Sequence, residues 1–304
     1  MRDRQLMLLC RLLRRVTRVL YKFNGTGLPR VAELIRRSVA KIAHRKSALS
    51  RLVIDDFRGR SKFICDLGEH IGSQLFFRGQ YSEAELDTLE RILKKEFVFV
   101  DIGANQGVFT VCAAGMLTEG KVYAFEPVSH LRKRLEENLQ VNNYGNVIIF
   151  DCGLSDISGQ KVPIFESDTL FDDGTNNAGL PSLFREGPGY RTIEEILLLR
   201  LDDFTEQIGP VDVIKIDVEG AELAVLRGGE STISKYKPYI IFEANASALR
   251  AAGENIDTLF AYLIEMGYRL NIIGERGQLS AVTDGDLGFA NVLASHPERS
   301  RRVS

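Results

Sequence analysis

Short apolar runs alternate with amphipathic segments through most of this chain. The runs predict strands at residues 97–102, 121–125, 146–152, 211–216, 239–243, 268–273 and 289–294. Between them, apolar residues recur with helical spacing at residues 108–117, 129–141, 222–227 and 256–266. Uninterrupted apolar strands are typical of a parallel sheet that is covered on both faces. The pattern therefore predicts an α/β fold with a seven-stranded, mostly parallel sheet and helices on both faces.

Two further segments precede and interrupt this alternation. Residues 51–68 contain two short apolar runs that predict a strand pair, and Ser82 with Glu85 forms a capping box at the start of an amphipathic helix. Residues 159–200 are rich in turn-forming residues and show no regular element. An insertion of this length is typical of an active-site flap.

The N-terminal 50 residues differ from the rest in charge. They hold 13 lysines and arginines against two acids, a net charge of +11, which leaves −13 for the remainder of a chain of net charge −2. Helical spacing places one set of apolar residues on a single face, namely Leu6, Leu9, Leu13, Val16 and Leu20. The basic residues gather on the opposite face, namely Arg4, Arg11, Arg14, Arg15, Arg18 and Lys22. This pattern predicts a basic amphipathic helix.

Two interpretations of this extension stay open. Residues 1–22 could lie in an anionic membrane surface, with the apolar face among the acyl chains. Alternatively, the helix packs on the rest of the chain and its arginines are merely solvated. Nucleic acid is not an expected partner, because the extension lacks an array of aromatic residues for stacking and the remainder is acidic.

Composition sets the domain organisation and the compartment. The 304 residues, 44% of them hydrophobic, predict one substantial core. We expect a basic helical extension at residues 1–50, a lead-in at 51–95, the main domain at 96–296 and a flexible tail at 297–304. The four cysteines show no metal-ligand spacing, and no apolar run is long enough to span a bilayer. These features favour a cytoplasmic protein with free thiols, at most peripheral at the inner face of the membrane.

The most specific chemical signal is FVFVDIGANQG at residues 97–107. It ends a strand in Asp101 and turns into a helix through Gly103 and Gly107. In a dinucleotide site an acid at this point would repel the phosphates, whereas it suits a ligand with an amine or sulfonium. The next strand ends in Glu126, a residue type that accepts ribose hydroxyls. The two acids together predict S-adenosylmethionine, rather than the NAD that Glu126 alone would also suit.

Five acids each end a different predicted strand. They are Asp101, Glu126, Asp151, Asp217 and Glu243. Ligands of open parallel sheets bind at the carboxyl ends of the strands, so we expect these side chains to converge on one rim.

Three more motifs carry a family resemblance: GLSD at residues 153–156, VIKIDVEGAE at 213–222 and IIFEAN at 240–245. With the first motif, they make the chain resemble the FkbM family of S-adenosylmethionine-dependent methyltransferases. The resemblance implies a class I methyltransferase, or Rossmann-like, fold. It also implies, as in many members, O-methylation of a sugar or polyketide hydroxyl.

The resemblance and the positions together imply a cofactor site. Its expected residues are Asp101, Gly103, Asn105, Gly107, Glu126, Asp151, Cys152 and Asp156. Asp101 is expected to hold the ammonium of the methionine part, the glycine loop to shape the turn beneath it, and Glu126 to bind the ribose. Asp151, Cys152 and Asp156 are expected to meet the adenine.

The expected catalytic residues are Asp217, Glu219 and Glu243. Lys215 and Glu222 surround them in a supporting role, and Asn245 joins Glu243 as a candidate for holding acceptor hydroxyls. Either Asp217 or Glu219 acts directly as a base, or two or more carboxylates hold a divalent cation that acidifies the hydroxyl. The metal ligands stay unassigned. His70 is a third candidate base, and Tyr81 with Glu83 matches the capping motif of the family only in part.

The expected function is therefore S-adenosylmethionine-dependent O-methylation of a sugar, glycolipid or polyketide-type acceptor. Three alternatives remain. The chain could be a non-catalytic relative that binds the cofactor, a membrane-surface adaptor that acts through its basic extension, or an NAD-dependent oxidoreductase.

Overall fold

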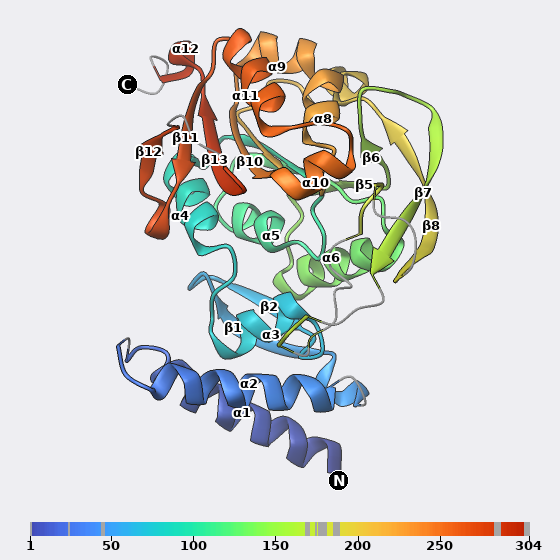
Figure 1. Ribbon diagram of the computed structural model, residues 1–304. Coiled ribbons are helices and arrows are strands. Elements are labelled where there is room, and N and C mark those ends of the chain that lie inside the picture. The colour runs from blue at the N-terminus through green and yellow to red at the C-terminus, as the bar shows by residue number, and fades with distance from the viewer. Residues whose placement is uncertain are drawn as a thin grey trace. The chain divides into compact units, whose positions relative to one another are not determined.

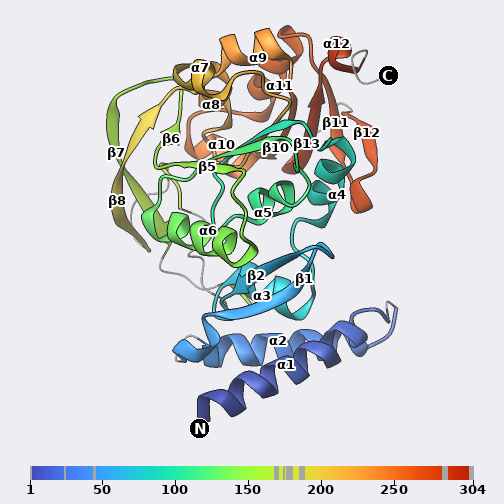
Figure 2. The same cartoon turned by 180° about the vertical axis from the view of Figure 1, so that it is seen from behind.

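The computed structural model describes residues 2–23, 25–43, 46–167, 171–173, 175, 181–184, 189–282 and 287–300. The chain forms two compact units (Figure 1 and Figure 2). The first comprises Met1–Ser82 with Ser167–Leu180, and the second comprises Glu83–Glu166 with Pro181–Ser304. The four-part division expected from the sequence stays a prediction. The expected tail begins with the short helix α12 (Pro297–Ser300), and residues 301–304 lie outside the described residues.

The first unit combines a helical hairpin with a strand pair. Its elements are α1 (Arg2–Leu20), α2 (Leu28–Ala43), η1 (Ser47–Leu49), β1 (Leu52–Phe57), β2 (Ser61–Cys65) and α3 (His70–Phe77). The helices α1 and α2 lie side by side. The strands β1 and β2 are antiparallel, as predicted. No helix of the described residues is both long enough and apolar enough to cross a membrane.

Polar contacts fix one face of α1. Arg14 and Arg18 turn inward, form ion pairs with Asp56 and donate to the carbonyls of Phe76 and Leu75. Those carbonyls belong to the last turn of α3, and the Leu75 carbonyl also accepts the backbone N–H of Gly79. The second interpretation, in which the arginines are merely solvated, therefore does not hold for these two.

The second unit is built on an eight-stranded mixed sheet of order β12-β11-β13-β10-β9-β3-β4-β5. The strands are β3 (Val98–Ile102), β4 (Lys121–Phe125), β5 (Val147–Phe150), β9 (Val213–Ile216), β10 (Tyr239–Asn245), β11 (Arg269–Ile273), β12 (Leu279–Ala281) and β13 (Phe289–Ser295). Strands β5, β4, β3, β9 and β10 are parallel, and β13, β11 and β12 continue the sheet through antiparallel pairs. The prediction of seven strands is wrong by one. All three residues of β12 are exposed, so no apolar alternation marked it.

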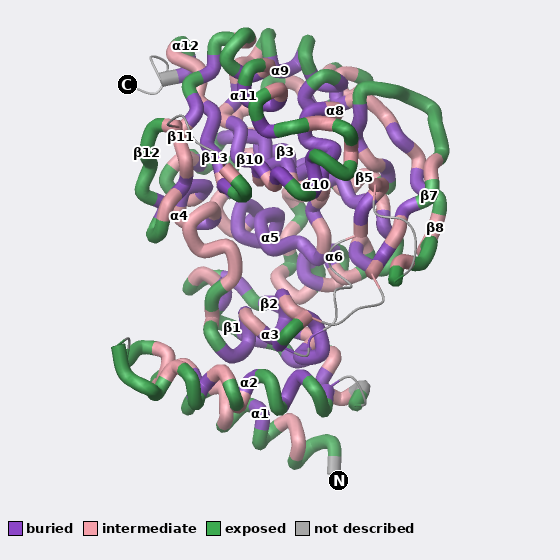
Figure 3. Tube along the Cα trace, in the orientation of Figure 1, coloured by how far each residue is buried: buried purple, intermediate pink, exposed green. Residues whose placement is uncertain are grey.

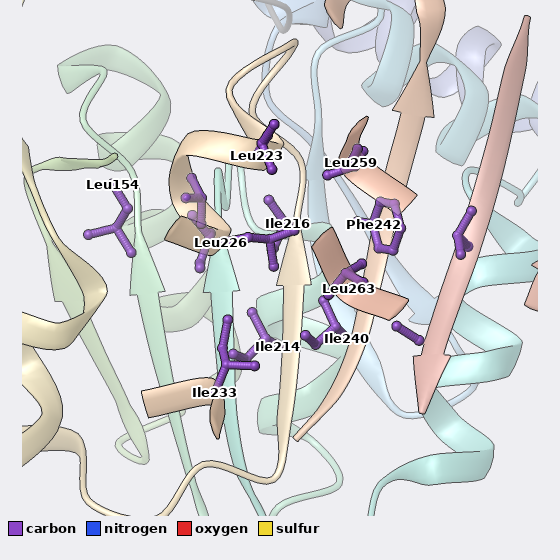
Figure 4. Packing of buried hydrophobic residues seen from close by; sticks show 14 of the residues in the cluster. Leu154, Ile214, Ile216, Leu223, Leu226, Ile233, Ile240, Phe242, Leu259 and Leu263 are labelled. Carbon is purple, nitrogen blue, oxygen red and sulfur yellow. The ribbon is translucent and has the colours of Figure 1, made fainter. Parts of the chain in front are cut away.

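Helices cover both faces of this sheet. One side carries α4 (Glu83–Ile92), α5 (Val108–Ala114) and α6 (Ser129–Asn142), and the other carries α8 (Glu222–Gly228), α9 (Glu230–Tyr236), α10 (Ala246–Ala251) and α11 (Ile256–Glu265). Further short helical segments lie between strands. They are η2 (Leu201–Phe204) and α7 (Thr205–Ile208), between β8 and β9, and η3 (Glu275–Gly277), between β11 and β12. Figure 4 shows Ile214, Ile216, Ile240 and Phe242 of the sheet packed with leucines of α8 and α11. Each such buried side chain stabilises the fold by about 1.5 to 3 kcal/mol.

The expected insertion contains regular structure. Strands β6 (Gly153–Leu154), β7 (Gln160–Ser167) and β8 (Tyr190–Leu199) form a separate sheet of order β6-β8-β7. The prediction of no regular element over residues 159–200 is therefore wrong for β7 and β8. Most of the intervening turn-rich residues, at 168–170, 174, 176–180 and 185–188, lie outside the described residues, so the flap interpretation stays a prediction.

All four cysteines are free and buried, as expected. Cys10 and Cys65 belong to the first unit, and Cys112 and Cys152 to the second.

Candidate functional site

The carboxyl ends of the parallel strands are aligned in register. Phe150, Phe125, Ile102, Ile216 and Phe242 pair across β5, β4, β3, β9 and β10. The residues that follow them are Asp151, Glu126, Gly103, Asp217 and Glu243. Four of the five expected acids thus follow the same row of the sheet. Asp101 differs, because it lies within β3 and pairs in register with Lys215 of β9.

The turn from β3 to α5 depends on positive φ angles. Gly103, Asn105 and Gly107 have φ values of 77°, 53° and 92°. A Cβ atom on Gly103 would lie 2.0 Å from the carbonyl oxygen of Asp217, and one on Gly107 would lie 2.5 Å from Leu135 Cδ1. The two glycines therefore let the turn pass close to the end of β9 and to α6.

Asp101 and Glu126 are both buried. The Thr110 hydroxyl donates to Asp101 Oδ2 over 2.5 Å, and burial raises the pKa of Asp101 to about 6. Glu126 accepts the backbone N–H groups of Asn105 and Val128 over 2.7 and 2.9 Å. Burial raises the pKa of Glu126 to about 7.

Glu126 keeps capacity for a ligand. Each carboxylate oxygen carries two lone pairs, and the two backbone bonds use one lone pair on each oxygen. The remaining lone pairs can accept two hydroxyl groups. The Glu126 carboxylate therefore fits the two hydroxyl groups of the ribose of a nucleoside cofactor.

The residues expected to meet adenine separate into two kinds. Asp151 and Asp156 are exposed, and the Ser155 hydroxyl donates to Asp156 over 3.2 Å. Cys152 is buried in the core beneath the sheet, and burial raises the pKa of its thiol to about 12. Cys152 is therefore a neutral thiol at physiological pH, and its contact with the adenine stays a prediction.

Lys215 is a buried ammonium at the centre of a group of carboxylates. Its Nζ atom lies 3.1 Å from Asp217 Oδ2 and 5.0 Å from the centre of the Phe109 ring. Burial alone would lower the pKa of Lys215, but the charges of Asp217, Glu85 and Glu243 outweigh it and raise that pKa. The ammonium therefore stays charged and holds these acids close together.

Glu243 is the half-buried carboxyl of this group at the end of β10. Burial, with the nearby charge of Asp217, raises the pKa of Glu243 to about 7. Asn245 Nδ2 donates to Glu243 Oε1 over 3.3 Å, while Asn245 Oδ1 accepts the N–H groups of Ser247 and Ala248 at the start of α10. Asn245 therefore caps a helix and orients Glu243 at the same time.

The turn after β9 is held by Glu222. Its carboxylate accepts the N–H groups of Gly220, over 3.1 and 3.2 Å, and of Val218, over 3.4 Å. Glu219 has a φ of 52°, and its carbonyl accepts the Ser182 hydroxyl over 3.3 Å. Glu222 therefore shapes the backbone beside Asp217, and its supporting role in catalysis stays a prediction.

Comparison with known proteins assigns the family. The sequence profile of the methyltransferase FkbM domain matches residues 101–270, more than half of the chain. The chain belongs to the FkbM methyltransferase family. The matched segment runs from Asp101 in β3 to the start of β11 and includes the whole carboxylate row.

The match to relatives of this chain spans only part of each relative. The AMB antimetabolite synthetase AmbE of Pseudomonas aeruginosa is 26% identical over an alignment of 234 positions that covers 67% of this chain and 11% of AmbE. The hexuronic acid methyltransferase AglP of Haloferax volcanii is 31% identical over an alignment of 166 positions that covers 53% of this chain and 63% of AglP. The crystal structure of methyltransferase FkbM from Methylobacillus flagellatus KT is 17% identical with a TM-score of 0.44, covering 87% of this chain and 60% of the other. The chain thus spans less than two thirds of each of these relatives.

Sequence reasoning missed one member of the candidate site. Glu85 of α4 was interpreted only as part of a capping box, yet its charge acts on Lys215. No local pattern reveals this, because the two residues are far apart in the sequence. Lys215 itself had a signal, since it is a charged residue within the buried strand VIKI.

His70 lies outside the matched FkbM segment, in the first unit. Its Nδ1 atom is 3.2 Å from Asp173 Oδ2, and its ring centre is 4.8 Å from that of Phe171. Burial lowers the pKa of His70 despite the carboxylate. These contacts account for His70 within its own unit. The Tyr81 ring meets it edge-on, and Glu83 begins α4.

Metal ligands were left open by the sequence. In the described part of the chain, no three His, Cys, Asp or Glu residues lie in an arrangement that could hold a metal ion.

Proposed function

We propose that this protein is an S-adenosylmethionine-dependent O-methyltransferase that acts on a hydroxyl of a sugar, glycolipid or polyketide-type acceptor. One observation carries the proposal. Buried Glu126 follows the same row of the sheet as Asp217 and Glu243, and buried Asp101 pairs in register with Lys215 one position before that row. Membership of a methyltransferase family supports the reaction class.

The half of the site at the ends of β3, β4 and β5 suits the cofactor. Asp101, with a pKa of about 6, is mostly ionised at neutral pH and would attract an ammonium group. Glu126 would accept the ribose hydroxyls, and Asp151 and Asp156 are exposed near the place expected for the adenine. When bound, S-adenosylmethionine supplies an electrophilic methyl group on its sulfonium.

The other half of the site, at the ends of β9 and β10, suits the removal of a proton. A hydroxyl becomes nucleophilic when a base accepts its proton, and a base with a pKa near the working pH is the most effective. We assign this role to Glu243, whose pKa is raised to about 7. Asp217 keeps that pKa high, Lys215 limits the repulsion between the two acids, and Asn245 orients the carboxylate. A base of this kind contributes about 100- to 10,000-fold in rate.

The name of one relative suggests which acceptors to test first. AglP is named for a hexuronic acid, so saccharides that contain a hexuronic acid are the first acceptors to test. Asp217 and Glu243 also supply oxygen ligands of the type that Mg²⁺ prefers. A chelator included in the assay therefore separates a metal-assisted reaction from direct proton transfer.

The test has two steps. Calorimetry should give a higher affinity for S-adenosylmethionine than for NAD, and Glu126→Gln should weaken the former by about 1.5 to 3 kcal/mol, the range for hydrogen bonds to a charged group. Glu136→Gln, at an exposed site on α6, is the matched control. Incubation with methyl-labelled S-adenosylmethionine and the saccharides should then label the acceptor. Tighter binding of NAD would overturn the proposal, and binding without transfer to any saccharide, glycolipid or polyketide acceptor would favour a non-catalytic relative.

A further inference from the structure

One face of α1 is apolar and exposed. Leu8, Leu9, Leu12, Val16 and Val19 are 42% to 59% exposed, and Phe23, just beyond the helix, is 51% exposed. At 3.6 residues per turn, the five positions of α1 fall within about 100° of its circumference. We call these five residues the α1 stripe. Figure 3 shows the exposed segments along the helix.

The α1 stripe has no part in holding the helix in the first unit. The packed face is a different one, with Cys10 and Thr17 buried and with Arg14 and Arg18 paired to Asp56. The Thr17 hydroxyl also donates to the carbonyl of Phe77. Because these contacts already fix α1, the α1 stripe presents apolar area to solvent without a structural role in the described unit. Such area on a soluble surface marks an interaction site.

Positive charge adjoins the α1 stripe along one side. Arg4, Arg11, Arg15 and Lys22 are exposed, and helical spacing places them in one row next to the α1 stripe. We call them the basic row. The surrounding 50 residues carry a net charge of +11. An apolar stripe bordered by lysine and arginine is the pattern of a helix that lies in the interface of an anionic bilayer.

We propose that α1 docks flat on an anionic membrane surface. The α1 stripe enters the boundary of the acyl chains, and the basic row contacts lipid phosphates. The helix lies on the membrane and does not cross it, in agreement with the described helices. A second copy of the chain suits the surface less well, because an antiparallel pair of α1 stripes would bring two basic rows together and, among the described residues of α1, no opposite charge borders the α1 stripe to pair with them. This inference does not depend on the proposed methyl transfer.

Vesicle sedimentation tests the proposal on the full chain. The protein should bind vesicles of phosphatidylglycerol mixed with phosphatidylcholine, bind phosphatidylcholine alone far less, and detach as salt rises. Leu12→Asp combined with Val16→Asp should weaken binding at least about tenfold, since one large apolar side chain is worth about that factor. Ile264→Asp is the matched control, because Ile264 is a 58% exposed side chain on α11, outside α1.

The basic row has its own variant. Arg11→Gln combined with Arg15→Gln should weaken binding and reduce its salt dependence. Lys133→Gln combined with Lys161→Gln removes two exposed charges elsewhere and should have little effect.

A fluorescence measurement reports the depth of insertion directly. The chain contains no tryptophan, so Val16→Trp introduces a single emitter within the α1 stripe. Its emission should shift to shorter wavelength on anionic vesicles, whereas that of Ile264→Trp should not. Circular dichroism should be unchanged in all variants, because the replaced residues are exposed.

Three results would overturn the proposal. The wild type could fail to bind anionic vesicles, the Asp variant could bind as tightly as the wild type, or the Val16→Trp emission could stay unshifted on vesicles that sediment with the protein. A change of self-association on substitution of the α1 stripe, without vesicle binding by the wild type, would instead identify an interface between copies.

Discussion

At the scale of single residues, the proposed base gives the sharpest test. Glu243→Gln keeps the size of the side chain and removes its ability to take a proton. Turnover should fall at least about 100-fold, while the Kd for S-adenosylmethionine should change little, because Glu243 is not among the cofactor residues. Glu265→Gln, at an exposed site on α11, should behave as the wild type. Near-normal turnover in Glu243→Gln would assign the base to another carboxylate.

Asp217 is distinguished from Glu243 by the pH profile. The wild-type rate should rise with pH through about 7, as Glu243 ionises. The charge of Asp217 contributes to that raised pKa, so Asp217→Asn should lower the pKa of Glu243 and move the rising limb to lower pH. If Asp217 is itself the base, the same variant should instead lose at least about 100-fold in rate at every pH. Rate measurements from pH 5 to pH 9 with one acceptor decide between the two.

At the scale of elements, the turn after β3 depends on a close backbone approach. Gly103→Ala would place a Cβ 2.0 Å from the carbonyl oxygen of Asp217, at a φ of 77°. The left-handed conformation costs about 1 to 2 kcal/mol and overpacking about 1 to 3 kcal/mol, so the free energy of unfolding should fall by at least about 2 kcal/mol. Denaturant titration measures this change.

Gly145→Ala is the matched control, because a Cβ atom at Gly145 meets nothing within 4 Å. A loss in Gly103→Ala no larger than in this control would show that the turn can move away from β9.

The same elements show how far the sequence could predict the structure. The strands of the parallel core were predictable, since their buried apolar runs need only local reading. The three residues of β12 are exposed and form no apolar run. Strand β8 follows a turn-rich stretch of sequence that suggested a loop. At the site, the motifs located the acids, but the influence of Glu85 on Lys215 arises from packing between distant segments. No local spacing contains that information.

At the scale of the whole molecule, buried acids make stability depend on pH. The pKa values of Asp101, Glu126 and Glu243 are raised to about 6, 7 and 7. Between about pH 4.5 and 7 the folded protein therefore holds protons that the unfolded chain has released. The free energy of unfolding should fall as pH rises through this window, by up to about 1.4 kcal/mol per pH unit for each group.

At lower pH, the free energy of unfolding should change in the opposite direction, because the pKa of one carboxyl is lowered by folding. Burial acts to raise the pKa of Glu33, but hydrogen bonds from Arg36 and Arg37 lower it to about 2. Its stabilisation is therefore lost only as pH falls below about 4.5. Urea titrations across the range should give a maximum of stability in mildly acid solution, and Glu126→Gln should flatten the decline above it. A stability that increases from pH 5 to pH 7 would contradict the raised values.

The buried thiols allow the opening rates of the two compact units to be measured separately. A thiol that is sealed in the core reacts with an alkylating reagent only when its surroundings open. The alkylation rates of Cys10 and Cys65 therefore report how often the first unit opens, and those of Cys112 and Cys152 report the same for the second. Mass spectrometry of the native protein, sampled over time, should resolve the four rates. Equal alkylation rates at all four thiols would mean that the molecule opens as one cooperative body. One rate for Cys10 and Cys65 and another for Cys112 and Cys152 would mean that the two units open independently.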